Sequence, residues 1–364
     1  MASSKLSSLG MRVILVEREA VLAGGPSTRN EGWLHRGTYH ANSVRDRTMA
    51  IQVAKRCIYG HEQIRSIAPE SVEDIGSRTF AMVRDAEHIP EVVERWTAAG
   101  VRFQDSSLNS VRELFPKANI SHVAGVYEVA DVSIDTTILY RKLLTESLRN
   151  NVELHLKATI DHIDGMRASI VTVDGKHLHI EADVFVYAAG FGARTIFAKH
   201  FRVELEIRYW KSHLVILPRL GQAGLFYLEP HEAAIMHHGE RSIVGLNEDA
   251  MLSAEPNYSV SPDIAGKLHR ALDRLVPGWS SSGYEDIACT KSDLAPQGSV
   301  RSLNIAICEP VPGHFCILPG KMTEAPFLTD KLVQILHVRL QNQSIAKRPC
   351  DLLSFKSMEE SYAS

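Results

Sequence analysis

The stretch of residues 12–40 constrains the fold of this chain more than any other. It begins Arg-Val-Ile-Leu-Val-Glu-Arg, and a run of branched apolar residues ending in an acid is typical of a buried parallel strand. In nucleotide-binding α/β folds, an acid at the end of the second strand accepts hydrogen bonds from a ribose. Glu17 is therefore the first candidate ligand, with Arg18 beside it.

A glycine-rich segment follows this strand directly. Residues 23–40 contain four glycines among small residues and hydroxyls. Such a composition lets a backbone lie close to a bulky ligand and point its N–H groups at phosphate or carbonyl oxygens. A glycine-rich loop alone is weak evidence, but its position after a strand that ends in Glu strengthens it. The candidate contacts in this loop are Ser27, Thr28, Arg29, Asn30, Glu31 and Gly32.

Two later segments have the same character. Residues 182–194 indicate a buried strand that ends in Ala-Ala-Gly, where Ala189 and Gly190 allow a close approach; a plain strand with a tight turn is the alternative. Residues 313–326 combine a strand, a Gly-x-x-Thr loop and a helix start. Backbone N–H groups and the positive end of the helix can meet a developing negative charge there.

These three segments resemble the flavin-contacting segments of FAD-dependent oxidoreductases of the D-amino-acid oxidase and glycine oxidase (DAO) family. Residues 27–35, followed by Gly37-x-Tyr39, are similar to the pattern S-R-N-S-G-V-I-H-A-G-x-Y of the branch that contains L-2-hydroxyglutarate dehydrogenase. The resemblance covers roughly residues 3–340. It implies FAD as cofactor, with further contacts from the strand and loop residues Ile160, Gly320, Met322 and Thr323.

The beginning of the family pattern is not found. The family opens with a strand and G-x-G-x-x-G, which admits the FAD pyrophosphate to a helix N-terminus. Counting back from Gly10, the third glycine of this motif would lie before residue 1, and residues 2–9 match only the end of the following helix. We therefore expect this strand and its phosphate loop to be missing, which would expose strand edges and remove the pyrophosphate cradle.

The predicted fold class is α/β with two lobes, a Rossmann-like FAD-binding lobe and a mostly antiparallel β substrate lobe. Strand-like runs dominate residues 205–298 and are interrupted by one helix at residues 264–275. We assign residues 1–70, 130–198 and 313–345 to the FAD lobe, residues 71–129 and 199–312 to the substrate lobe, and residues 346–364 to a loosely held tail.

The resemblance implies an enzyme that removes two electrons from a C–H bond next to an amine or hydroxyl, with hydride passing to flavin N5. His35 is the first candidate for the base, and a structural hydrogen bond to the loop backbone is its equally weighted alternative. Lys321 and His213 are further catalytic candidates. Recognition of a substrate carboxylate needs cations, and the residues available are Arg36, His40, Lys211, His213 and Lys321.

Two positions depart from the family pattern. Trp33 and Arg36 stand where the family has small residues. These larger side chains would narrow the pocket or change its charge, which allows a substrate other than 2-hydroxyglutarate. A rival interpretation is a non-catalytic homologue with weak or no FAD binding. A third is an amine or amino-acid oxidase, which differs in whether dioxygen reoxidises the flavin, and no residue decides this.

Composition excludes other classes of function. A net charge of −3 and a pI near 6.6 give no electrostatic reason to expect nucleic acid or a membrane surface as partner. The longest apolar runs are too short to span a bilayer, and the start shows no signal peptide. Five scattered cysteines favour reduced thiols and a cytoplasmic location. We interpret His237-His238 as a turn rather than a metal site.

Overall fold

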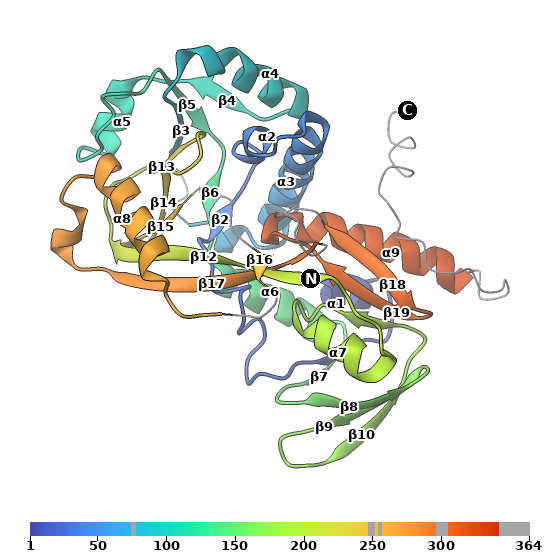
Figure 1. Ribbon diagram of the computed structural model, residues 1–364. Coiled ribbons are helices and arrows are strands. Elements are labelled where there is room, and N and C mark those ends of the chain that lie inside the picture. The colour runs from blue at the N-terminus through green and yellow to red at the C-terminus, as the bar shows by residue number, and fades with distance from the viewer. Residues whose placement is uncertain (74–77, 247–251, 254–256, 296–304, 342–364) are drawn as a thin grey trace.

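A nine-stranded mixed sheet forms the upper lobe of the molecule (Figure 1). The computed structural model describes residues 1–73, 78–246, 252–253, 257–295 and 305–341. Strand order is β16, β12, β15, β14, β13, β3, β5, β4, with β17 paired to β12; only β13 and β3 are parallel. This confirms the predicted, mostly antiparallel sheet. The strands are β3 (Thr79–Val83), β4 (Phe103–Asp105), β5 (Gly125–Val129), β12 (Ile207–Pro218), β13 (Gly224–Tyr227), β14 (Ala233–His238), β15 (Arg241–Leu246), β16 (Leu252–Ser253) and β17 (Glu285–Leu294).

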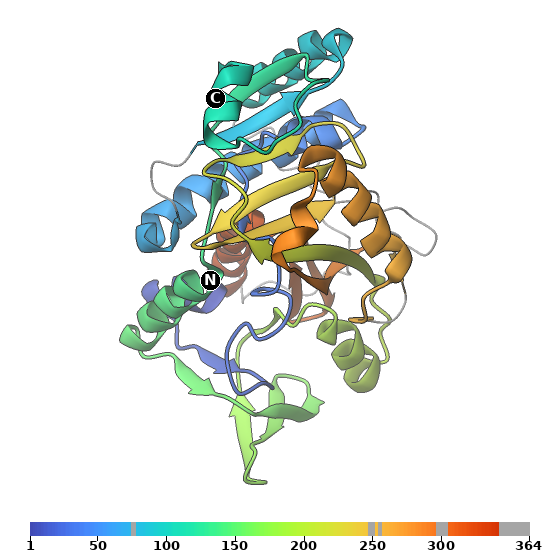
Figure 2. The ribbon, with the colours of Figure 1, turned by 90° about the vertical axis from the view of Figure 1, so that its left-hand side faces the viewer.

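Helices cover both faces of this sheet (Figure 2). Helices α5 and α8 pack on one face, where Leu268, Leu272 and Leu275 form the apolar stripe predicted for α8. Helices α2, α3 and α4 pack on the other face. Helix α4 ends as predicted at Gly100, whose φ of 76° is left-handed. The bounds are α2 (His40–Ser43), α3 (Arg47–Ile67), α4 (Ile89–Ala99), α5 (Leu108–Leu114) and α8 (Pro262–Leu275), with short 3-10 turns η1 (Pro69–Ser71), η2 (Ala86–His88) and η3 (Trp279–Ser282).

The lower lobe has a three-stranded sheet at its centre. Strand β19 lies between β11, its parallel neighbour, and β18, its antiparallel neighbour. Helices α1 and α9 pack on one face, and α7 packs on the other together with strands β8 and β9 of a separate antiparallel sheet. The elements are α1 (Ala2–Ser8), β8 (Thr159–Asp164), β9 (Arg167–Val171), β10 (His177–Glu181), β11 (Phe185–Tyr187), α7 (Gly192–Phe201), β18 (Ala306–Val311), β19 (His314–Leu318), η4 (Met322–Glu324) and α9 (Ala325–Gln341).

Strand β1 (Ile14–Val16) pairs in parallel with β7 (Glu153–His155), which follows α6 (Thr136–Arg149). The parallel pairing agrees with the sequence, but the prediction that β1 is buried was wrong, because all three of its residues are only half-buried. The strand before Ala189 was also predicted to be buried, and only Tyr187 of β11 is. In the described ranges β1 pairs with β7 alone and β11 with β19 alone, so each strand has one edge without a neighbour to cover it.

His237 and His238 are not in a turn, as was predicted, but end β14. Each His237 ring nitrogen has a partner, Ser242 Oγ and Ala223 O, both at 2.9 Å, so the imidazole satisfies buried polar groups. The turn begins one residue later, at Gly239. The proposed tail, residues 346–364, lies outside the described residues, and the division of the chain between the two lobes stays a prediction.

Candidate functional site

The 32–40 loop lies between the two lobes, and its backbone path requires a glycine at its start. Gly32 has a φ of 57°, and a Cβ there would lie 2.3 Å from His238 Cε1 and 2.9 Å from the Ile134 carbonyl oxygen. Strand β2 (Trp33–Leu34) then pairs with β6 (Val132–Ser133). The predicted close backbone approach is present here, toward strand β14 of the large sheet.

A buried carboxylate organises the middle of this loop. Asp131 accepts hydrogen bonds from Trp33 Nε1 (3.1 Å), from the Arg36 backbone N–H (3.1 Å) and from Thr38 Oγ1 (2.5 Å). Burial would raise the pKa of the Asp131 carboxyl, but His35 and these donors together hold it below its ordinary value. Asp131 is therefore an anion enclosed within the loop.

His35 lies beside Asp131 and between two rings. Its Nδ1 is 3.8 Å from Asp131 Oδ1, its ring centroid is 4.2 Å from that of Trp33, and the edge of the His40 ring meets it at 4.4 Å. Burial lowers the pKa of His35 below its ordinary value, and the opposing effect of Asp131 does not offset this. His35 is thus a neutral imidazole at neutral pH, which suits a proton acceptor.

Glu31 contacts the large sheet. Its carboxylate lies 3.0 and 3.1 Å from Lys291 Nζ on β17 and 3.4 Å from Ser212 Oγ on β12. Burial would raise the pKa of Glu31, but Lys291 outweighs it and lowers the pKa to about 2. Glu31 was predicted to contact a cofactor; in the structure its side chain holds the loop to the substrate-side sheet.

The 320–324 loop carries the second predicted flavin-side group. Gly320 has a φ of 65°, a conformation that favours glycine. After it, Lys321 Nζ and Arg56 Nε each lie 2.6 Å from the fully buried carboxylate of Glu324. Burying a carboxylate is costly unless it is paired, and here it has two cations. Met322 is half-buried, and Thr323 is buried with no hydrogen-bond partner for its hydroxyl.

Helix α3 joins the two loops. Toward the 32–40 loop, His61 Nδ1 of α3 lies 3.3 Å from the Leu34 carbonyl oxygen. Toward the 320–324 loop, a Cβ added at Gly60 of α3 would lie 1.6 Å from the Thr323 carbonyl oxygen. With Arg56 bonded to Glu324, consecutive turns of α3 contact both loops. Two segments that are about 290 residues apart in the sequence therefore share one helix as their support.

Two predicted residues do not join this group. Strand β12 has an unbroken register with β17, so alternate residues face opposite sides, and Ser212 faces Glu31. His213 and Lys211 are therefore on the opposite face. His213 Nε2 accepts the N–H of Ser261 at the start of α8, and Lys211 binds Asn257. Burial lowers the pKa of His213, which suits this acceptor role in holding α8.

Arg36 and His40, the other cations considered for carboxylate recognition, lie in the loop itself. Arg36 is buried and bonds to Glu62 with Nη2 at 2.6 Å from Oε1, so its charge is already neutralised. His40 touches the His35 ring edge-on. Of the cations proposed from the sequence, His40 and Lys321 remain near His35; Lys321 is among the charges that act on the pKa of His35.

The residues predicted to hold the adenosine half lie in the lower lobe. The Glu17 carboxylate accepts the Glu19 N–H at 2.9 Å, and Arg18 pairs with Glu19. Residues 23–32 form a loop that bonds to itself: Thr28 Oγ1 donates to Ala23 O, and Asn30 Nδ2 donates to the carbonyls of Pro26 and Ser27. The side chain of Arg29 is exposed.

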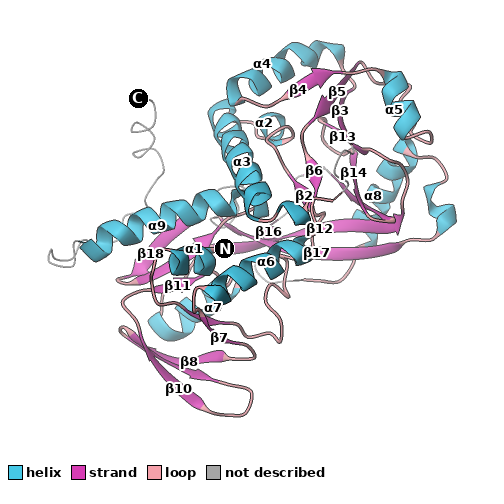
Figure 3. Ribbon diagram, turned by 180° about the vertical axis from the view of Figure 1, so that it is seen from behind, coloured by secondary structure: helices cyan, strands magenta, loops and turns pink. Residues whose placement is uncertain are grey.

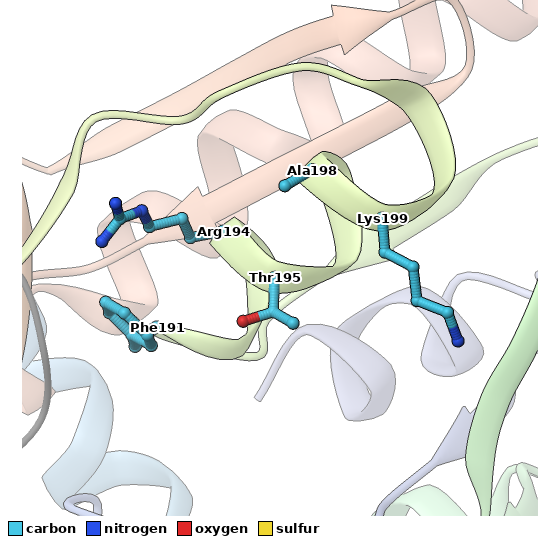
Figure 4. Close-up of a pocket in the computed structure, with 5 residues that line it drawn as sticks. All are labelled: Phe191, Arg194, Thr195, Ala198 and Lys199. Carbon is cyan, nitrogen blue, oxygen red and sulfur yellow. The ribbon is translucent and has the colours of Figure 1, made fainter.

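Helix α7 borders a pocket of about 420 Å³ on this side of the molecule (Figure 4). The helix begins next to Ala189 and Gly190. One face of the helix lines the pocket, through Phe191, Arg194, Thr195, Ala198 and Lys199. Lys199 Nζ donates to Asp161 O at 3.3 Å, directly after Ile160 on β8. Helix α7, which lines the pocket, thus follows the predicted strand end at Ala189 and Gly190 and is bonded to strand β8, which carries Ile160.

Sequence motifs did not point to several residues that build this site. Asp131, Lys291, Arg56 and Glu324 are single charges without a motif around them. Asp131 alone had a local signal, since it is an acid within a strand-like apolar run that leads into the capping residue Asp135.

No group of His, Cys, Asp and Glu in the described residues could hold a metal ion. Among those residues, no helix is long and apolar enough to cross a membrane.

Comparison with known proteins gives a single family. The family model described as "DAO: FAD dependent oxidoreductase" matches residues 4–313. No curated protein sequence matches the chain.

Solved structures share the fold of this chain, which Figure 3 shows coloured by secondary structure. Glycine oxidase from Geobacillus kaustophilus matches with a TM-score of 0.68 at 16% identity, over 97% of this chain and 94% of that one. Dithionite-reduced L-α-glycerophosphate oxidase from Mycoplasma pneumoniae with FAD bound matches with a TM-score of 0.70 at 18% identity, over 96% and 93%. L-proline dehydrogenase from P. horikoshii has a TM-score of 0.69 at 14% identity, over 96% and 91%. At these identities the likeness establishes the fold.

Proposed function

The chain belongs to the DAO family of FAD-dependent oxidoreductases, and from its site we propose that it oxidises the CH–NH or CH–OH group of a small amino acid or 2-hydroxy acid. The observation that carries this proposal is the meeting of the 32–40 and 320–324 loops on α3. Both loops, from distant parts of the sequence, were predicted from the family resemblance to face the flavin.

The residues present fit a flavin with an anionic reduced form. The 320–324 loop supplies Lys321, the start of α9 and a buried Thr323 hydroxyl without a partner in the described structure. Gly320 and Gly190 supply backbone without side chains at the two predicted strand ends. The α7 pocket has Arg194 and Lys199 on its wall, two cations of the kind that pair with phosphate groups.

The chemistry divides between cofactor and protein. FAD, when bound, accepts the two electrons of the oxidised C–H bond. His35 takes the proton from the substrate's hydroxyl or amine, because it is neutral and sits in a loop that excludes most water. The ring of Trp33 packs against the rings of Tyr39 and Phe226 beside His35, and the centroids of the buried Trp33 and Phe226 rings are 4.7 Å apart.

The substrate class comes from two kinds of support. The solved structures with this fold include an oxidase of glycine and a dehydrogenase of L-proline, and the 27–39 pattern is similar to the L-2-hydroxyglutarate dehydrogenase branch. The narrowing of the pocket that we expect from Trp33 agrees with small acids of either kind. We also propose a cytoplasmic location, on the basis of the scattered cysteines; no disulfide joins the four that lie in the described residues.

The test is the visible absorption spectrum of the purified chain, followed by anaerobic addition of glycine, L-proline, sn-glycerol 3-phosphate and L-2-hydroxyglutarate. We expect flavin absorbance that one of these substrates bleaches. His35→Gln should keep the flavin and slow bleaching by about 100-fold or more, as expected for loss of a general base. His122→Gln, on an exposed histidine, is the matched control and should bleach at the normal rate.

A homologue without tight FAD binding is the second candidate. It is favoured by the one-sided pairing of β1 and β11, whose edges would border the pyrophosphate in a doubly wound sheet. A colourless protein that stays colourless after incubation with FAD would support this candidate and refute the first. The same measurement on a chain extended upstream by any in-frame glycine-rich strand shows whether that strand restores binding.

A further inference from the structure

Asp131 is a carboxylate with no exposed surface. Its side chain is 0% exposed, and three donors reach it: Trp33 Nε1 and the Arg36 N–H on Oδ1, and the Thr38 hydroxyl on Oδ2. A buried carboxylate is expensive unless donors surround it, and removing such an arrangement leaves an unpaired charge. Three donors from one loop around one acid are more than the loop needs for its shape.

The nearest ring nitrogen to this carboxylate is His35 Nδ1. It is buried, has no hydrogen bond within ordinary distance, and lies 3.8 Å from Oδ1. Hydrogen bonds of catalytic groups are commonly long before a substrate binds, and they shorten in the complex. In a neutral imidazole that carries its proton on Nδ1, the other ring nitrogen, Nε2, is a proton acceptor.

We propose that Asp131 is a positioning residue for His35: it holds the proton on Nδ1 and leaves Nε2 as the base for the substrate. This rests on the proposed function. When the substrate is oxidised, its O–H or N–H proton goes to Nε2, and the C–H hydrogen leaves with its two electrons to the flavin. The imidazolium that results is stabilised by the buried charge of Asp131, a few ångströms away.

The charges around His35 come from several elements. Asp131 and Glu31 favour the protonated ring, Lys321 of the 320–324 loop disfavours it, and the His40 ring meets it edge-on. Burial outweighs the two acids, so the ring is neutral before the reaction. Asp131 is the closest of these charges and the one whose removal should change His35 most.

Asp131→Asn is a sharp test because asparagine can keep the shape and the hydrogen bonds. Its carbonyl oxygen can accept from Trp33 Nε1 and the Arg36 N–H, and its amide can donate to the Thr38 hydroxyl, which rotates to accept. The variant therefore removes the charge and little else. The matched control is Asp286→Asn, which removes the charge of a second Asp–His pair, 2.8 Å from His269 on the α8 side of the sheet.

The experiment is a 1H–15N NMR titration of histidine-labelled protein, with the His35 signals assigned by their loss in His35→Gln. In the wild type we expect the Nδ1–H tautomer. Asp131→Asn should lower the pKa of His35 by about one to three pH units, the usual effect of losing a close opposite charge. In the flavin-loaded protein, kcat should fall about 10- to 100-fold and the acid limb of its pH profile should move to lower pH.

Two results would overturn the proposal: an Nε2–H tautomer of His35 in the wild type, or an unchanged His35 pKa in folded Asp131→Asn. If the variant does not fold, the wild-type tautomer alone decides. Asp286→Asn should leave the His35 titration where it is. The NMR titration needs no flavin, so it tests the Asp131–His35 pair separately from the proposed function. A colourless protein with the expected titration refutes the proposed function but supports the pair. A yellow protein without the expected titration refutes the pair.

Discussion

Single residues hold the 32–40 loop in place, and Glu31 does so across the two lobes. Its carboxylate belongs to the loop, whereas its partners Lys291 and Ser212 belong to the large sheet. Both charged side chains are about one-fifth exposed, so water weakens the pair only partly. Lys291 also lies 4.8 Å from the centre of the Trp210 ring, which fixes its direction.

Lys291→Met should destabilise the chain by about 2 kcal/mol, because it leaves a largely buried carboxylate without its cation while keeping the packing on Trp210. The effect depends on pH in a defined direction. The pKa of Glu31 is lowered from 4.5 to about 2, so its ionised form stabilises the fold above about pH 4.5, and this contribution is lost as pH falls toward 2. Urea unfolding at pH 7 and pH 3 measures both.

The control for this prediction is Glu181→Gln, which removes a carboxylate that is 71% exposed. It should change stability by no more than about 0.5 kcal/mol at either pH. Equal effects of the two variants would show that Glu31 and Lys291 do not form a stabilising pair.

At the scale of elements, α3 fixes the distance between the two flavin-side loops. Its 21 residues run past both of them, and its contacts are a hydrogen bond, an ion pair and a backbone approach that only glycine permits. Asp46 starts the helix by accepting the Met49 N–H. A rigid helix transmits a displacement at one loop to the other.

Gly60→Ala should push α3 and the 320–324 loop apart, because the added Cβ would lie 1.6 Å from the Thr323 carbonyl oxygen, a backbone atom that cannot rotate away. We expect a loss of about 2–3 kcal/mol in stability and lower flavin occupancy. Thermal unfolding and the flavin-to-protein absorbance ratio measure these. Gly266→Ala, in the middle of α8 with only the flexible end of Arg270 nearby, should be neutral or slightly stabilising.

The elements themselves were largely predictable from the sequence. Helix α6 begins at the cap Asp135, and β9 and β10 are joined by a turn that contains Asp174 and Gly175; both are signals of short range, because caps, glycines and apolar spacing act over a few residues. The burial of β1 was not predictable, since it depends on which strands flank it. Asp131 and Lys291 were missed for the same reason: their partners are 95 and 260 residues away.

At the scale of the whole molecule, the two lobes share the site. The 32–40 loop contacts the large sheet through Glu31 and Gly32, and α9 and β19 of the lower lobe deliver the 320–324 loop to α3. A ligand that touches both loops therefore stabilises the entire chain, because no single lobe can unfold without losing contacts to it.

Added FAD should raise the melting temperature of the chain. At a free concentration one hundred times its Kd, a ligand that binds only the folded state contributes about 2.7 kcal/mol, which corresponds to about 3.5 °C for a chain of this size. Riboflavin, which lacks the adenosine and phosphate groups, is the control and should give a smaller shift. A melting temperature that stays constant at every FAD concentration would contradict the assignment.

The ion pair between Arg56 and Glu324 joins residues that are 268 positions apart. At about 5–20 residues per second, α3 leaves the ribosome roughly 15 to 50 seconds before its partner is synthesised. Until then the part of α3 that carries Arg56 and Gly60 lacks the 320–324 loop, which it contacts in the finished arrangement. The site is therefore completed only near the end of translation. A nascent chain that stops before residue 324 contains all the strands of the upper sheet but lacks the second loop of the cofactor site.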